Sequence, residues 1–181
     1  GNNYIVNGTK NWVTSGENSD LIIFFCKTEK GAGSKGISAF IIEKGTPGLT
    51  TGKKEEKLGI RASDTCELYF DNCEIPESNL IGNLGQGFSI AMQALGGGRI
   101  GIASQSVGLA RAALDKSISY SQEREQFGQP IAKFGAIQNK IADMATNIEA
   151  ARLLVMQAAT LKDQGKEYIK ESSMAKLFAS S

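Results

Sequence analysis

The hydrophobic period of this chain changes near Pro76. Before that residue, apolar side chains come in short runs rich in β-branched and aromatic types, separated by Gly, Asn, Asp and Pro. After it, apolar side chains recur at the three- and four-residue spacing of a helix surface. A strand pattern followed by a helical pattern predicts a multi-domain α+β chain. We expect a small antiparallel β sandwich or barrel over residues 1–77 and an antiparallel helical bundle over residues 78–181.

Five stretches of the first region have strand character. Residues 4–6 and 12–14 flank Asn7-Gly8, a pair typical of a two-residue hairpin turn whose positions both need positive φ. Residues 21–26 form an unbroken apolar run, which predicts a strand buried on both faces. Residues 37–42 predict another strand, and residues 68–70 predict one that ends at Asp71-Asn72.

Three helices are expected in the second region. The first begins near Gln86 and is broken at Gly128-Gln129-Pro130. The second carries an apolar stripe from Ile137 to Ala158 and ends at Gly165. The third begins near Lys166 and continues to the last residue. Because the chain starts at Gly1 without Met and stops inside a helical pattern, we expect it to be an internal piece of a longer protein.

Charge and apolar runs exclude two classes of partner. The formal net charge is +1, so no global field would draw the chain to nucleic acid or to an anionic membrane. No apolar run approaches the ~20 residues that a membrane span requires. We therefore expect neither nucleic-acid binding nor a membrane span.

Histidine and cysteine content excludes several kinds of site. The chain has no histidine, which rules out Ser-His-Asp catalysis, Cys-His catalysis and histidine metal sites within it. The three cysteines, Cys26, Cys66 and Cys73, fit neither a disulfide framework nor a zinc pattern. We expect reduced, buried thiols and no metal.

Trp12 and Thr14 are the first candidate site residues. They lie two residues apart near the end of a predicted strand, so their side chains should point the same way. A tryptophan can lie against a flat aromatic ring, and a threonine can donate a hydrogen bond to it. From the pattern alone, packing of Trp12 in the core is favoured.

The run Gly96-Gly97-Gly98-Arg99 lies inside a helical pattern. Each glycine there costs about 1 kcal/mol relative to alanine, so the run needs a reason, such as close approach of a ligand or of another helix. Arg99 could meet a phosphate or carboxylate, and a tight helix crossing with a solvated arginine is an equal alternative.

Arg124 lies near the end of the first helix, where it could bind an anion or simply complement the helix dipole. The glycine-rich residues 31–36 lack the spacing of a phosphate-binding P-loop. They also fall between two predicted strands instead of opening a helix, so we expect a flexible hairpin loop there.

The succession of motifs resembles the acyl-CoA dehydrogenase family, most closely its short-chain, butyryl-type members. Residues 7–14 (NGTKNWVT) are similar to the family's NGxKxWIT stretch, and the resemblance extends in order over essentially the whole chain. The further matching segments are residues 35–40, 46–49, 57–65, 75–76, 87–88 and 98–103, and Arg124, Phe127 and Gly128 of an RxxFG pattern.

The resemblance implies a fold and a cofactor. The chain would be the middle β domain, residues 1–77, followed by the first part of a C-terminal four-helix bundle, residues 78–181. Trp12, Val13 and Thr14 match positions that contact the flavin ring of FAD. The substrate-contacting segment would be Gly96, Gly97, Gly98 and Arg99. Arg124 and Phe127 match residues that reach the FAD of a neighbouring subunit, in the homotetramer usual for the family.

The implied reaction is α,β-dehydrogenation of an acyl-CoA thioester to the trans-2-enoyl-CoA. A glutamate removes the α proton, and the β hydrogen leaves as hydride to the flavin. Electrons pass on to an electron-transfer flavoprotein. The catalytic glutamate would fall beyond Ser181, so no catalytic residue is assigned and the chain alone should be inactive. The implied location is the bacterial cytoplasm or the mitochondrial matrix.

Two positions depart from the family pattern. Gly96 stands where short-chain members have aspartate, and Gly135 stands where many members have a glutamine that contacts the partner FAD, although Gln138 is retained. Both departures bear on ligand affinity. Two alternative functions therefore remain open: an acyl-CoA oxidase-like enzyme that passes electrons to oxygen, and a non-catalytic relative that keeps the scaffold.

Overall fold

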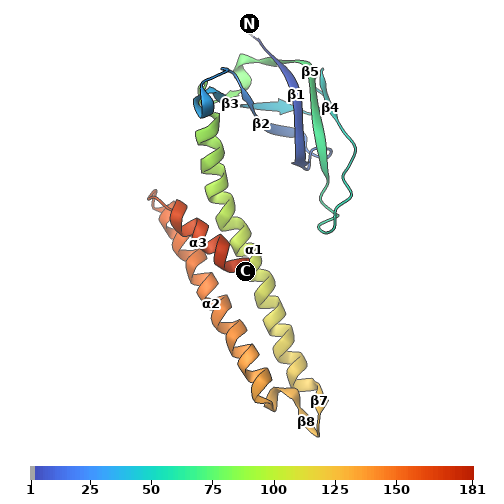
Figure 1. The fold of residues 1–181 in the computed structure, drawn as a ribbon, viewed down its shortest axis with the longest axis vertical. Helices are drawn as coiled ribbons and strands as arrows, with labels where there is room; N and C mark the ends of the chain where they lie inside the picture. Colours follow the sequence, from blue (N-terminus) through green and yellow to red (C-terminus); the bar gives the residue numbers. More distant parts are fainter. Residues whose placement is uncertain (1–2) are drawn as a thin grey trace. The chain divides into compact units, whose positions relative to one another are not determined.

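A computed structural model describes residues 3–181, and Figure 1 shows its elements in chain order. The chain divides into two compact units, residues 1–91 and residues 92–181. The division falls inside the first long helix, α1 (Gly87–Glu123). The domain boundary expected after residue 77 stays a prediction.

The first unit contains two three-stranded antiparallel sheets (Figure 1). One sheet has the strand order β1-β5-β4, and the other has the order β2-β3-β6. The bounds are β1 Asn3–Thr14, β2 Leu21–Lys27, β3 Ile37–Glu43, β4 Leu49–Thr51, β5 Thr65–Pro76 and β6 Leu80–Ile81. Antiparallel strands with hydrophobic inner faces confirm the expected β-sandwich class.

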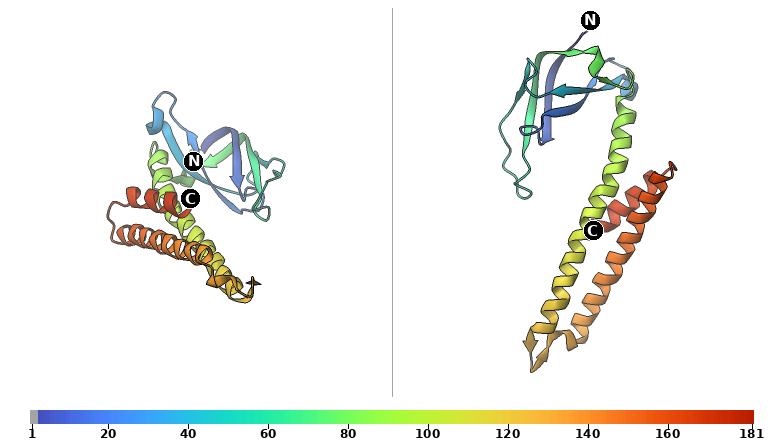
Figure 2. Two further views of the ribbon diagram at one scale, coloured as in Figure 1. Left: turned by 60° about the horizontal axis from the view of Figure 1, so that its bottom comes forward. Right: turned by 180° about the vertical axis from the view of Figure 1, so that it is seen from behind.

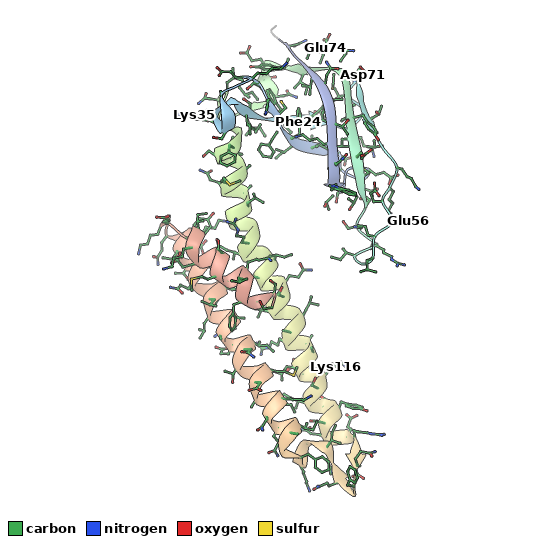
Figure 3. All side chains as sticks on the ribbon, viewed as in Figure 1. Phe24, Lys35, Glu56, Asp71, Glu74 and Lys116 are labelled. Carbon is green, nitrogen blue, oxygen red and sulfur yellow. The ribbon has the colours of Figure 1, made fainter. Side chains whose placement is uncertain are left out.

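The core of this unit lies between the two sheets. Phe24 and Phe40 of one sheet stack with ring centroids 5.7 Å apart, and Phe24 also meets Phe70 of the other sheet at 4.8 Å. Phe24 is labelled in Figure 3. Both sheets contribute fully buried aliphatic side chains, including Ile42 and Ile75. Burial of such side chains stabilises by about 1.5–3 kcal/mol each.

The predicted hairpin at Asn7-Gly8 is wrong. These residues lie inside one continuous strand, β1, which pairs with β5 along its length. The Asn72 backbone N–H donates to the Asn7 side-chain oxygen at 2.8 Å, across a bulge on β5. Gly8 has φ +148°, but Asn7 is not left-handed, so the two-residue turn cannot form. Pairing with a distant strand has overridden the local turn preference.

Two other strand predictions need correction. β2 is not buried on both faces: Ile22 and Phe24 are buried, whereas Leu21 and Ile23 are each 58% exposed. The alternation is that of a strand with one face on the core. The strand predicted at residues 68–70 does not end at Asp71, because β5 absorbs a bulge there and continues to Pro76.

Two loops lie at the edges of this unit. Residues 52–64 join β4 to β5, and Glu56 lies on this loop (Figure 3). The glycine-rich segment forms a short 3-10 turn, η1 (Gly33–Gly36), on which Lys35 lies. It connects β2 to β3 and opens no α-helix, and its flexibility stays a prediction.

The second unit is helical. After α1 come the strand pair β7 (Glu125–Gln126) and β8 (Gln129–Pro130), then α2 (Gly135–Asp163) and α3 (Ile169–Ala179). α2 runs back alongside α1 in both views of Figure 2. Ala103 of α1, Val155 of α2 and Ala175 of α3 form its buried centre. These three side chains pack against one another, so each of the three helices contributes to the buried centre.

Gly165 ends α2 as expected. It has φ +65°, and its N–H donates to the Lys162 carbonyl at 3.0 Å. The next N–H, of Lys166, reaches back to the Leu161 carbonyl at 2.9 Å, which completes a Schellman cap. Three helices in this arrangement agree with an incomplete antiparallel bundle. Of the helices within residues 3–181, none has the combined length and apolarity needed to cross a bilayer.

Candidate functional site

Trp12 lies at a β-bulge near the end of β1. Two residues of β1, Asn11 and Trp12, stand there opposite the single residue Glu67 of β5. Trp12 has φ +61°, a left-handed conformation that is costly for a bulky side chain. Its side chain is 71% exposed, so the prediction of core packing is wrong. The bulge turns the indole out of the sandwich toward solvent.

Val13 and Thr14 complete this end of the strand. Val13 is half-buried and packs against the sandwich core, whereas Thr14 is exposed. Trp12 and Thr14 therefore both present their side chains to solvent on either side of an inward-pointing valine. A flat indole and a hydroxyl at one strand end are groups that can face a planar aromatic ligand.

A turn of residues 15–19 follows Thr14, and Asp64 binds it. One carboxylate oxygen, Oδ2, accepts the backbone N–H of Glu17 at 2.8 Å, and Oδ1 accepts the side-chain amide of Asn18 at 2.8 Å. The Asp64 carbonyl accepts the N–H of Ser15 at 3.0 Å. Asp64 is 2% exposed. Two hydrogen bonds hold the pKa of Asp64 below its usual value: the larger effect comes from the Asn18 amide and the next from the Glu17 N–H.

Gly96 has a close packing neighbour within its own unit. A Cβ at this position would lie 2.8 Å from Cδ1 of Ile169 and 3.2 Å from the hydroxyl of Tyr168. Both neighbours come from the start of α3, and Gly96 is buried. The neighbours of Gly96 are thus side-chain ends from the start of α3, and the contact is one of side-chain packing.

The other positions of the run have different surroundings. A Cβ on Gly97 would meet the Lys162 ammonium at 3.2 Å, whereas one on Gly98 would meet nothing within 4 Å. Arg99 is half-buried and has no ion-pair partner within residues 3–181. Within the run, Gly98 is thus the glycine that leaves space beside the helix backbone.

Arg124 and Phe127 belong to the connection between α1 and α2. Phe127 and Gly128 have φ +54° and +77° and form the two-residue turn of the β7–β8 hairpin. Phe127 is 92% exposed, and its ring meets Phe134 edge-on at 6.2 Å. Arg124 is exposed as well. The sequence predicted only a break here and missed the strained turn.

The candidate residues 96–99 lie far along α1 from the candidates Arg124 and Phe127. Arg99 and Arg124 are 25 positions apart, which corresponds to about 37 Å of helix at ~1.5 Å per residue. The two groups therefore cannot contact the same part of one small ligand within a single chain.

The position of Gly135 is open and exposed at the start of α2. Gln138, one turn later, donates its side-chain amide to the Ala132 carbonyl at 3.0 Å. Ala132 lies in the short 3-10 turn η3 (Ile131–Lys133). The retained glutamine is therefore engaged in holding the helix start.

Cysteines and acidic clusters provide no alternative centre in the described residues. The thiols are free, and burial raises the pKa of both Cys66 and Cys73, which disfavours the reactive thiolate. Across residues 3–181, no group of three Cys, Asp or Glu side chains is placed to hold a metal ion.

An open apolar groove of about 490 Å³ lies among the three helices of the second unit. Its wall includes Val107, Met144, Ile148 and Phe178. None of the predicted site residues lines it, so it is separate from the candidate site.

Asp64 and Tyr168 are the residues near the candidate positions that sequence reasoning missed. Asp64 lies in the matching segment of residues 57–65 without a role of its own there, and its partners lie 46 and 47 positions away. Tyr168 reaches Gly96 from more than 70 positions along the chain. No local pattern could have indicated either contact.

Comparison with known proteins identifies the family. The model for "Acyl-CoA dehydrogenase, middle domain" matches residues 1–73, and that for "Acyl-CoA dehydrogenase, C-terminal domain" matches residues 85–181. This chain belongs to the acyl-CoA dehydrogenase family. The matched segments account for nearly all of its length.

Individual relatives are similar over the whole chain. The short-chain specific acyl-CoA dehydrogenase of Rattus norvegicus, described as mitochondrial, is 52% identical over 180 residues, covering 99% of this chain and 44% of the relative. The solved butyryl-CoA dehydrogenase of Megasphaera elsdenii has TM-score 0.95 and 49% identity, covering 98% of this chain and 46% of that one.

A chain from a study of the electron transferring flavoprotein of Acidaminococcus fermentans and flavin-based electron bifurcation also matches. It has TM-score 0.95 and 53% identity, covering 99% of this chain and 47% of that one. This chain thus spans about half the length of the acyl-CoA dehydrogenase family members it matches.

Proposed function

We propose that the protein carrying this chain is an FAD-dependent acyl-CoA dehydrogenase that converts an acyl-CoA thioester to the trans-2-enoyl-CoA. The family membership and the likeness to short-chain relatives support this reaction. The observation that carries it is the exposed, left-handed Trp12 beside the exposed Thr14. A strained backbone that presents an aromatic ring to solvent is a feature of ligand sites.

The residues at the end of β1 fit a flavin. Trp12 would lie against the isoalloxazine ring, Thr14 would donate a hydrogen bond to its edge, and Val13 would fix both from the core side. When bound, FAD supplies the acceptor for the hydride that leaves the β carbon. The chain's own contribution at this end is to orient the ring and shield one of its faces from water.

The substrate side is proposed to lie at residues 96–99. Gly98 leaves open space beside α1, and the half-buried Arg99 is available to a phosphate or carboxylate. Gly96 and Gly97 would hold this segment in place by packing against Tyr168 and Lys162, respectively. Because glycine has no side chain, Gly96 offers no polar group to the CoA.

The hairpin tip is proposed to serve a second subunit. Arg124 stands about 37 Å along the helix from Arg99. Phe127, three residues further on, is a strained, exposed aromatic like Trp12. We infer that they contact the FAD of a neighbouring copy in a homotetramer. Arg124 would meet its anionic part, and Phe127 would cover apolar surface.

The general base is proposed to lie outside these 181 residues. A carboxylate that abstracts an α proton near neutral pH needs a raised pKa. Asp64 and Glu149 have lowered pKa values because of hydrogen bonds from Asn18 and from Arg152. Neither is suited to the role. Because the family resemblance implies a catalytic glutamate beyond Ser181, the 181-residue chain alone should show no turnover.

The electron acceptor is proposed to be an electron-transfer flavoprotein, which the matched chain from the Acidaminococcus fermentans study supports. The location is proposed to be the bacterial cytoplasm or the mitochondrial matrix. The rat relative, described as mitochondrial, supports a location in the mitochondrion.

Turnover of the complete gene product tests the proposal. With butyryl-CoA, we expect enoyl-CoA to form with reduction of electron-transfer flavoprotein and little oxygen consumption. Rapid oxygen consumption without need for the flavoprotein would instead indicate an acyl-CoA oxidase-like enzyme. An FAD-loaded protein that converts no acyl-CoA would indicate a non-catalytic scaffold relative.

A further inference from the structure

The turn after β1 has more backbone strain than its length explains. Trp12 and Ser15 both have φ +61°, so two non-glycine residues within four positions are left-handed. Such residues cost on the order of 1–3 kcal/mol each and persist only where the surroundings fix them. Contacts from elsewhere in the fold must therefore hold this segment.

Asp64 supplies those contacts from the neighbouring strand. It immediately precedes β5, whose first residue, Thr65, pairs with Thr14. Its backbone carbonyl binds Ser15, the residue next to Thr14, and its carboxylate binds the two residues at the turn's far side, Glu17 and Asn18. Asp64 thus forms hydrogen bonds with three residues, Ser15, Glu17 and Asn18, of the segment that follows Trp12.

A carboxylate is the group that this arrangement requires. Both of its oxygens accept hydrogen bonds from neutral donors, at 2.8 Å each. An asparagine would place an N–H₂ group against one of these donors. A buried carboxylate is expensive unless its oxygens are hydrogen-bonded, so its presence indicates a specific demand for two acceptors.

The turn is also folded tightly against the strand. A Cβ on Gly16 would lie 2.7 Å from Sγ of Cys66 and 3.4 Å from Cβ of Val13. The turn that Asp64 fixes therefore packs directly on the residue between Trp12 and Thr14. Movement of the turn would be transmitted to both neighbours of Val13.

We propose that Asp64 is a positioning residue for the flavin site, which holds Trp12 and Thr14 in their ring-facing arrangement by binding the turn of residues 15–19. This proposal rests on the proposed function, because it takes Trp12 and Thr14 as flavin contacts. Asp64 itself would touch neither the ligand nor the reacting atoms.

The test compares Asp64→Asn with Ile75→Val. Ile75 is fully buried in the same sandwich, and its shortening costs on the order of 1 kcal/mol without changing the turn. FAD affinity of each complete gene product is measured by titration of the apoprotein. We expect Asp64→Asn to weaken FAD affinity about tenfold, because a loosened turn would leave only about a tenth of the molecules with Trp12 and Thr14 in the binding arrangement, and Ile75→Val to leave it unchanged.

A second readout requires no flavin. Trp12 is the sole tryptophan of the chain, so fluorescence anisotropy decay of the 181-residue chain reports its local motion. We expect faster and wider motion of the indole in Asp64→Asn than in the parent or in Ile75→Val. Asn18→Ala, which removes one of the two carboxylate contacts, should give an intermediate effect in both measurements.

The outcomes separate the two proposals. If the unaltered gene product takes up no FAD, both the proposed function and the role of Asp64 are wrong. If it takes up FAD and Asp64→Asn matches Ile75→Val in affinity and in Trp12 motion, only the positioning role is overturned. A merely structural role for Asp64 would give that second result.

Discussion

The backbone of Gly87 at the start of α1 lies directly against Ser38 of β3. A Cβ added to Gly87 would come within 2.6 Å of the Ser38 carbonyl carbon. The buried Ser38 hydroxyl also accepts the N–H of Gly85 at 2.9 Å and contacts the Thr28 hydroxyl at 2.7 Å. The first turn of α1 is thereby fixed on the β sandwich, inside the first unit.

Gly87→Ala should destabilise the first unit. The atom it would meet belongs to the backbone of β3, which cannot rotate away, so we expect a loss of about 1–3 kcal/mol. Thermal and urea unfolding measure it. Gly101→Ala is the matched control, because a Cβ there meets nothing within 4 Å. Equal stability of the two variants would contradict the close contact at Ser38.

Gly98→Ala should stabilise the helical unit and weaken acyl-CoA binding. The position is exposed and open, so alanine adds about 1 kcal/mol through helix propensity alone. If an acyl-CoA approaches there, the methyl group also obstructs it. Unfolding midpoints and CoA-ligand titration of the complete gene product measure the two effects. Gly108→Ala, open and exposed on the same helix, should stabilise similarly without changing ligand affinity.

Phe127→Asn should also separate stability from binding. Asparagine tolerates the left-handed conformation of the hairpin turn far better than phenylalanine, so we expect a gain of about 1 kcal/mol. Loss of the exposed ring should lower FAD retention in the assembled protein. Flavin content per subunit after gel filtration measures this. Unchanged flavin content would remove Phe127 from the site.

The stability of the first unit should fall at acid pH through Asp64. Because its pKa is lowered in the folded state, the unfolded chain binds a proton at higher pH than the folded chain does. The stabilisation is complete above the ordinary aspartate range near ~3.9 and is lost as pH falls through the lowered value. The Asn18 and Glu17 hydrogen bonds are the main causes, and Lys54 adds a small lowering.

Unfolding free energies of the parent and Asp64→Asn, measured from neutral to acid pH, check this dependence. The difference between the two proteins should be largest near neutrality and should shrink as pH falls. A difference that stays constant, or grows toward acid, would show that the charge of Asp64 does not contribute.

The sequence predicted the elements that have a regular hydrophobic period over many consecutive residues. The helical period of residues 137–158 indicated α2, and Gly165 correctly marked its end. Asn7-Gly8 has an equally local turn signal, yet pairing with β5 draws it into a continuous strand. The apolar run at residues 21–26 could not show that Leu21 and Ile23 face outward, because alternation is invisible where every residue is apolar.

Parts of the candidate site contradict local preference, so propensity could not predict them. Trp12 and Phe127 are left-handed aromatics, a conformation that sequence rules assign to glycine or asparagine. Asp64 acts on a turn 46 positions away. Motif resemblance located Trp12 and Phe127, but only the structure shows that both are strained and exposed.

The central claim is that the indole of Trp12 and the hydroxyl of Thr14 face a flavin. Its most direct test is the flavin content of the complete gene product, purified after expression with ample riboflavin, beside a Trp12→Ala, Thr14→Val variant. We predict a yellow parent protein with FAD bound in each subunit and a variant that loses most of its flavin on gel filtration. A colourless parent that takes up no added FAD, or a variant that retains it fully, would contradict the account.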